Sequence, residues 1–246
     1  MWYPVKQKLK RIAKINNQQL PTNYKKILKQ YTNAFGLRGK KNIFLGELWR
    51  YKVVIANCDD FKIPHGYSLL PGIILINAQW AYKLIFDKSE EKEIAFKATV
   101  GHEYGHKMQH LHIRNIKNSV AFDKKCKHLN KADKRFIKWA NEVHCDFYGA
   151  KEVLCAKKNS LTISYNYKDD CKAKCGVKDE KTHPSWKMRK RYAEFGKYNA
   201  KLLEMIAEDV KESFQPIKLS VNEKVVNAVW DFYKREEIVL EPDQSV

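Results

Sequence analysis

Two histidines one helical turn apart constrain this chain more than any other feature of its sequence. His102, Glu103 and His106 form an H-E-x-x-H motif within a segment whose apolar residues have helical spacing. Residues i and i+4 lie on the same face of an α-helix, so both imidazoles can reach one metal ion. Glu103 can then act as a general base on a water molecule held at an open position of the metal. This arrangement is typical of zinc-dependent hydrolases.

The residues before the motif predict a short strand followed by a long helix. Residues 72–77 are apolar and rich in β-branched side chains, which favours a strand. The helical spacing predicts a helix over about residues 90–113, and Asp87 or Ser89 can cap its start. Gly105 destabilises a helix by about 1 kcal/mol. Its missing side chain would let another element pack close beside the metal.

A zinc site needs a third protein ligand, and the sequence offers two candidates. His112 follows the second motif histidine by six residues, which is the metzincin spacing, but Gln109 stands where that pattern has a glycine at a sharp turn. Glu142 lies on a second predicted helix, residues 131–155, with Asp146 one turn later. Glu142 can bind the metal while Asp146 orients a ligand histidine from behind. We favour Glu142, because the missing glycine breaks the pattern that His112 requires.

Taken in order, these motifs resemble one family of gluzincin peptidases, the family of HtpX heat-shock proteases and type I CaaX prenyl endopeptidases. That family carries an H-E-x-x-H motif, here residues 102–106, and then an E-x-x-x-D motif on a second helix, here residues 142–146. A His-Pro pair with a following arginine completes the pattern, here His183 with either Arg189 or Arg191. Three motifs in order are far more specific than H-E-x-x-H alone.

The resemblance covers about residues 60–195 and implies a zinc-dependent endopeptidase that acts on a peptide or protein substrate. One zinc ion per chain would be held by the two motif histidines and Glu142, with Glu103 as the general base. His183 would lie near the zinc and stabilise the tetrahedral intermediate. The strand at 72–77 would be a sheet edge that pairs with an extended substrate. The alternative is a catalytically silent or regulatory module of the same fold that binds a peptide or protein partner.

We therefore expect an α+β fold, mostly helical and zincin-like, with a small sheet whose edge strand flanks the motif helix. The expected divisions are a basic helical extension (1–40), a catalytic domain (41–200) and an acidic helical extension (201–246). The other expected elements are helices within 5–35 broken at 20–22, strands within 43–56, a looped insertion at 156–181, and helices at 184–213 and 222–237.

Many members of the family are membrane proteins, but this sequence predicts no membrane-spanning helix. The most apolar window, residues 69–86, contains Lys83, and no run reaches the roughly 18 apolar residues that a spanning helix needs. The residues after Met1 lack the apolar core of a secretory signal. A cytoplasmic location is therefore expected.

The cysteines give a weaker signal. Cys171 and Cys175 are separated by three residues and could bind a structural zinc together with Cys145 or Cys155. The usual paired C-x2-C spacing is absent, however. Free thiols, with Cys145 and Cys155 packed as small apolar residues, are the favoured interpretation.

Charge is distributed unevenly along a chain whose net charge is +19. The first fifty-two residues are rich in Lys and Arg and contain a single acid, Glu47, whereas acids are frequent from Glu204 onward. The basic region could dock on the acidic end, contact nucleic acid through phosphates, or lie on an anionic membrane surface with Leu9 and Ile15 in an apolar stripe. A solvated basic surface is an equally good interpretation.

Overall fold

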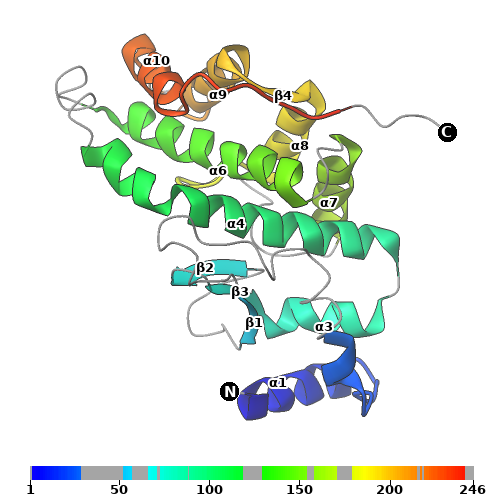
Figure 1. Ribbon diagram of the computed structural model, residues 1–246. Coiled ribbons are helices and arrows are strands. Elements are labelled where there is room, and N and C mark those ends of the chain that lie inside the picture. Colours follow the sequence, from blue (N-terminus) through cyan, green and yellow to red (C-terminus); the bar gives the residue numbers. More distant parts are fainter. Residues whose placement is uncertain are drawn as a thin grey trace.

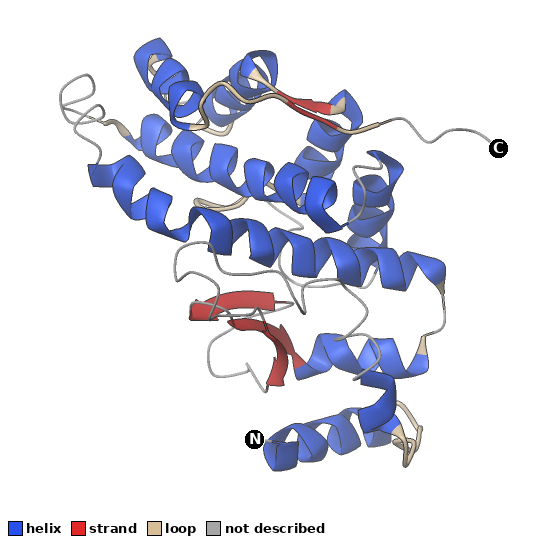
Figure 2. Cartoon of the chain, viewed as in Figure 1, coloured by secondary structure: helices blue, strands red, loops and turns tan. Residues whose placement is uncertain are grey.

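In its described part the chain folds mainly into helices, with two small sheets (Figures 1 and 2). The computed structural model describes residues 2–28, 52–56, 66–70, 73–87, 89–118, 129–153, 158–170, 179–214, 217 and 219–241. The helices are α1 (Trp2–Ile15), α3 (Ala78–Phe86), α4 (Glu90–Asn118), α6 (Lys131–Val153), α7 (Lys158–Asp170), α8 (Trp186–Phe195), α9 (Ala200–Glu212) and α10 (Glu223–Phe232). The strands are β1 (Lys52–Ala56), β2 (Gly66–Leu70), β3 (Ile73–Asn77), β4 (Lys197–Tyr198) and β5 (Ile238–Val239). The expected α+β, mostly helical class is confirmed.

Helix α4 runs through the middle of the molecule and separates its two halves. Helix α6 packs along one side of α4, with α9 and α10 beyond it, while α7 packs against both α4 and α8. The sheet of β1, β2 and β3 lies on the other side of α4 together with α3, and α1 lies beyond them (Figure 1). Both long helices have nearly the predicted bounds.

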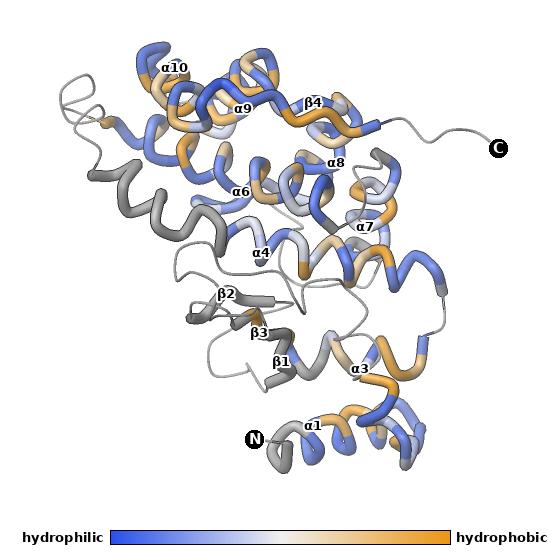
Figure 3. Tube along the Cα trace, viewed as in Figure 1, coloured by the Kyte–Doolittle hydropathy of each residue, from blue (hydrophilic) through white to orange (hydrophobic). Residues whose placement is uncertain are grey.

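Buried apolar side chains form one cluster on each side of α4. The first cluster joins α1, β3, α3 and α4 through residues such as Leu9, Ile74, Trp80 and Phe96. The second joins α6 to α8, α9 and α10 and includes Trp139, which is fully buried. Hydrophobic and hydrophilic residues alternate along these helices, as expected when one face of each is buried (Figure 3). The division of the chain into a domain with two extensions stays a prediction.

The order of strands in the larger sheet corrects one expectation. The order is β1-β3-β2, with β1 parallel and β2 antiparallel to β3. The strand expected at 72–77 is β3, and it is the central strand, so the prediction that it forms an edge is wrong. The edge strand beside α4 is β2, which lies between β3 and α4 (Figure 1). The sequence did not predict β2, because Gly66 and Ser68 interrupt the β-branched and aromatic residues that are typical of strands.

The expected looped insertion at 156–181 is also wrong, because residues 158–170 form helix α7. Its buried residues are Ser160, Leu161, Ser164, Tyr165 and Lys168, which have the spacing of one helical face. Ser, Tyr and Asn are weak helix formers, so local propensity did not reveal the helix. Packing against α4 and α8 stabilises it instead.

The single helix expected at 184–213 is divided in two at Gly196. Its φ of 81° lies in the left-handed region that favours glycine, and it ends α8. Asn199 then caps α9 by accepting a hydrogen bond from the backbone N–H of Leu202. Between these two caps β4 pairs with β5, a strand pair that the sequence did not predict.

The basic N-terminal helix packs on the protein through its apolar side. Leu9 and Ala13 of α1 are buried, while Ile15 is 72% exposed. Because α1 packs on α3 and β1, and α10 lies at the opposite end of the molecule, α1 does not dock on the acidic end (Figure 1). Contact of its exposed face with nucleic acid or an anionic membrane surface stays a prediction.

The start of α4 agrees with the expectation from the sequence. Ser89 is the cap of α4, since its hydroxyl accepts from the N–H of Lys92 at 3.4 Å, and Asp87 accepts from the N–H of Ser89. Within the described ranges no helix is both long enough and apolar enough to cross a bilayer.

Candidate metal centre

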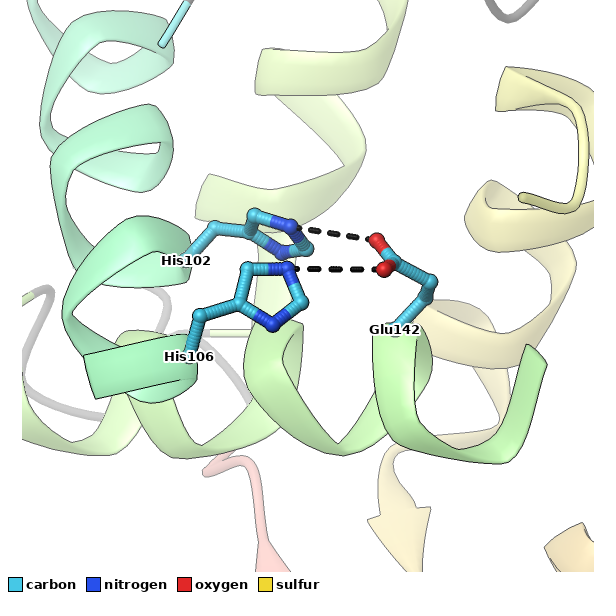
Figure 4. Close-up of side chains that lie close together, drawn as sticks. All are labelled: His102, His106 and Glu142. Carbon is cyan, nitrogen blue, oxygen red and sulfur yellow. Dashed lines mark ion pairs between the residues drawn. The ribbon is translucent and has the colours of Figure 1, made fainter. Parts of the chain in front are cut away.

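The structure brings together two histidines of α4 and one glutamate of α6 (Figure 4). Nε2 of His102 lies 3.2 Å from Oε2 of Glu142, and Nε2 of His106 lies 3.4 Å from Oε1 of the same carboxylate. One ligand atom from each residue lies within 4.8 Å of the other two. This group can hold a metal ion.

Three glycines let α4 and α6 approach closely enough to form this group. A Cβ built on Gly149 would lie 2.3 Å from the carbonyl carbon of Gly101, which no real contact tolerates. One turn further along α4, a Cβ on Gly105 would lie 3.0 Å from the backbone of Cys145. The expectation that Gly105 permits close packing beside the site is confirmed, and α6 is the element that packs there.

The carboxylate of Glu142 is placed as a metal ligand would be. Its Oε2 atom is buried and accepts no hydrogen bond of acceptable geometry from the described residues. Nε2 of His102 and Nε2 of His183 nevertheless lie 3.2 and 3.4 Å from it. An orphaned buried carboxylate oxygen is unfavourable unless a cation or water satisfies it. The donor set of two imidazoles and one carboxylate suits Zn²⁺.

His102 is held from behind by a buried ion pair. Its Nδ1 lies 2.8 Å from Oδ1 of Asp146, and Nε of Arg189 donates to Oδ2 of the same carboxylate at 2.8 Å. The predicted orienting role of Asp146 agrees with this geometry. Of the two arginines considered from the sequence, Arg189 is the one at the site, because Arg191 donates to Asp209 instead.

Helix α7 contributes to the same ion pair, which the sequence could not show. The guanidinium carbon of Arg189 lies 5.5 Å from the ring centre of Tyr165 and 4.9 Å from that of Trp186. Aromatic faces attract a cation, so the two rings help fix the guanidinium. If a helix had been predicted at 158–170, its apolar face would have pointed to Tyr165 as a buried residue that could contact the site.

The second histidine has a different partner. Nδ1 of His106 lies 3.2 Å from Sγ of Cys145, a fully buried residue of α6. From the sequence, Cys145 was expected to pack as a small apolar residue, with a structural zinc shared with Cys171 and Cys175 as the alternative. Helical spacing could have revealed the contact, because Cys145 is one turn after Glu142 and therefore on the same face.

Burial and close charges shift the pKa values at this site strongly. Burial lowers the pKa of His102, but the carboxylates of Asp146 and Glu142 outweigh it and raise that pKa to about 9. Burial raises the pKa of Glu142, yet His106 and His102 hold it well below its ordinary value. Burial and three nearby carboxylates raise the pKa of the Cys145 thiol. Without metal, His102 therefore favours its protonated form beside these carboxylates.

His183 lies beside the group, just before α8. Its Nε2 is 3.4 Å from Oε2 of Glu142, and its Nδ1 is 2.7 Å from the hydroxyl of Thr182. Its side chain is 46% exposed, so it can face solvent or a ligand. Ser185 caps α8 and Trp186 opens it, so the helix begins two residues after the expected start at residue 184.

Glu103 is buried on α4. Its carboxylate is close enough to the metal-ligand group to help raise the pKa of the Cys145 thiol. Its role as a general base stays a prediction.

Two other metal-binding alternatives came from the sequence, His112 as the third ligand and a structural zinc at Cys171 and Cys175. Helix α4 continues to Asn118 without the sharp turn that the metzincin pattern requires at residue 109. The side chain of His112 lies outside the described residues. So do Cys171 and Cys175, where the structural zinc was considered.

Comparisons of the chain with protein-family models, with curated proteins and with solved structures found no match. The resemblance to the HtpX and CaaX prenyl endopeptidase family therefore rests on the sequence motifs alone.

Proposed function

We propose that the protein is a zinc-dependent endopeptidase with a zincin-like catalytic domain. The observation that carries this proposal is the meeting of one buried carboxylate with two imidazoles across the α4–α6 contact. The sequence order of the motifs supports it. A zinc ion bound there would act as a Lewis acid toward water and the scissile carbonyl.

The chain's own residues have distinct tasks in this proposal. His102, His106 and Glu142 hold the metal, and Asp146 keeps Nε2 of His102 directed at it. Glu103 accepts the proton of the attacking water and passes it to the leaving amine. His183, next to Glu142 and partly exposed, donates a hydrogen bond to the developing oxyanion.

An extended peptide would bind along β2 in this proposal. Among the described strands β2 is paired on one side only, with β3, and it is the strand beside α4. A free strand edge can bind a peptide through backbone hydrogen bonds. The scissile bond would then lie close to the histidines of α4.

Metal analysis combined with a cleavage assay tests the proposal. The wild type should bind one zinc ion per chain and cleave casein or a peptide library. Glu103→Gln should keep the zinc and lose about 10²–10⁴ in rate, because it removes the base without removing a ligand. Glu142→Ala should lose most of the zinc, whereas His112→Ala is the matched control that keeps it.

The outcomes separate the two classes of function. Zinc binding without cleavage of any peptide would favour the silent or regulatory module. Full activity of zinc-loaded Glu103→Gln would exclude the proposed mechanism, and loss of zinc in His112→Ala but not in Glu142→Ala would overturn the ligand assignment.

A further inference from the structure

The two histidines of the proposed metal site are supported from behind in different ways. His102 has the Asp146 carboxylate, itself paired with Arg189. His106 has the Cys145 sulfur at 3.2 Å from Nδ1. A charged carboxylate is a much stronger hydrogen-bond acceptor than a thiol sulfur.

We propose that Cys145 is the positioning residue for His106, its sulfur accepting a hydrogen bond from Nδ1–H and so directing Nε2 at the metal. The inference rests on the proposed function for its metal. The geometry is already present without one, since Nε2 of His106 points at Glu142 while Nδ1 points at Cys145. An imidazole whose Nε2 binds a metal carries its proton on Nδ1, and a partner for that proton fixes the tautomer and the ring orientation.

The close helix contact explains why the partner is a thiol. A Cβ on Gly105 would lie 3.0 Å from Cα and from the carbonyl oxygen of Cys145 and 3.1 Å from its Cβ, so residue 145 lies where the helices are closest. Only a small side chain fits such a contact. A carboxylate there would add another negative charge beside Glu142 and Asp146 in a buried site, which is unfavourable. A small neutral acceptor satisfies both limits.

Zinc affinity of the full-length protein tests the inference. Zinc would be titrated into apo protein in competition with a chromogenic chelator. Cys145→Ala should weaken binding about tenfold, the low end of what loss of a ligand's hydrogen-bond partner costs. Cys145→Ser, which keeps a small acceptor, should recover most of the affinity. Thr99→Ala is the matched control, because the buried hydroxyl of Thr99 donates to the Ala95 carbonyl within α4, and this variant should bind zinc like the wild type.

A second measurement reports on the hydrogen bond itself. In ¹H–¹⁵N spectra of the zinc-loaded protein, the Nδ1–H proton of His106 should resonate downfield in the wild type, because it is hydrogen-bonded, and should move upfield in Cys145→Ala. The Nδ1–H proton of His102, which faces Asp146, is the internal reference and should not move.

Each outcome has one meaning. Unchanged affinity in Cys145→Ala, equal losses in the alanine and serine variants, or an equal loss in Thr99→Ala would overturn the inference, as would an unchanged position of the His106 Nδ1–H resonance in Cys145→Ala. If the wild type binds no zinc, the proposed function fails and the inference fails with it. If the wild type binds zinc and Cys145→Ala binds it equally well, only the inference fails.

Discussion

Replacing Gly149 by alanine would place a methyl group inside the closest contact between α4 and α6. The added Cβ would lie 2.3 Å from the carbonyl carbon of Gly101 and 2.7 Å from the backbone nitrogen of His102, whereas ordinary contacts begin at 3.4 Å. The helices must therefore separate by about 1 Å, because both close atoms belong to backbone.

The magnitude follows from two opposing effects. Overpacking a tight contact destabilises by about 1–3 kcal/mol, and alanine recovers up to about 1 kcal/mol through its better helix propensity. We expect a net loss of about 1–2 kcal/mol, which for a protein of this size lowers the Tm by about 2–8 °C. Zinc affinity should fall at least about tenfold, because metal–ligand distances tolerate only about 0.2 Å.

Differential scanning calorimetry and chelator competition measure the two effects. Gly105→Ala should lower the Tm less, since its Cβ would meet its neighbours at 3.0–3.1 Å. Lys134→Ala, at an exposed position of α6, is the control and should change neither quantity. Wild-type Tm and zinc affinity in Gly149→Ala would refute the argument that the glycines set the distance between the ligands.

Three further substitutions test other contacts. His183→Ala should lower kcat and kcat/KM together with unchanged zinc content, as measured by steady-state kinetics and metal analysis; unaltered kinetics would remove His183 from the site. Burial raises the pKa of Asp87, but hydrogen bonds from Tyr167 and from the start of α4 bring it below its ordinary value, so Asp87→Ala should lower the Tm at pH 7. That difference should shrink in thermal unfolding below about pH 4, as the wild-type carboxylate gains its proton and loses its stabilising effect; a difference constant from pH 7 to 3 would contradict this. Arg189→Met should destabilise by about 3–5 kcal/mol in urea unfolding, because Asp146 stays buried without its partner, and adding Asp146→Asn should restore part of the loss; a single variant as stable as the wild type would show that the pair contributes little.

The ligand group shows which part of the site the sequence could predict. His102 and His106 follow from helical geometry alone, since i and i+4 share a face in any helix. To predict Glu142 as the third ligand, one must know that α6 packs against α4. The sequence does not show this packing directly, and the prediction came from the order of the motifs. The contact between Cys145 and His106 was missed, although helical spacing places Cys145 on the same face of its helix as Glu142.

The fold shows the same division between local and long-range information. The bounds of α4 and α6 were predicted closely, because their apolar periodicity is strong and local. The position of β3 in the middle of its sheet depends on β2, whose residues carry no alternating pattern. Helix α7 depends on the surfaces of α4 and α8 that cover it.

The ion pair behind His102 has a consequence for the order in which the protein is made. Asp146 is 44 residues after His102, and Arg189 is 87 residues after it. Closing chain segments of this length is entropically unfavourable and slow compared with forming a single helix. A ribosome that has released α6 has already delivered all three metal ligands, yet the arginine that neutralises Asp146 is still to come. We expect stable metal capture, and any proteolytic activity that depends on it, only after α8 has emerged and docked, which would spare the synthesising cell from an active partial chain.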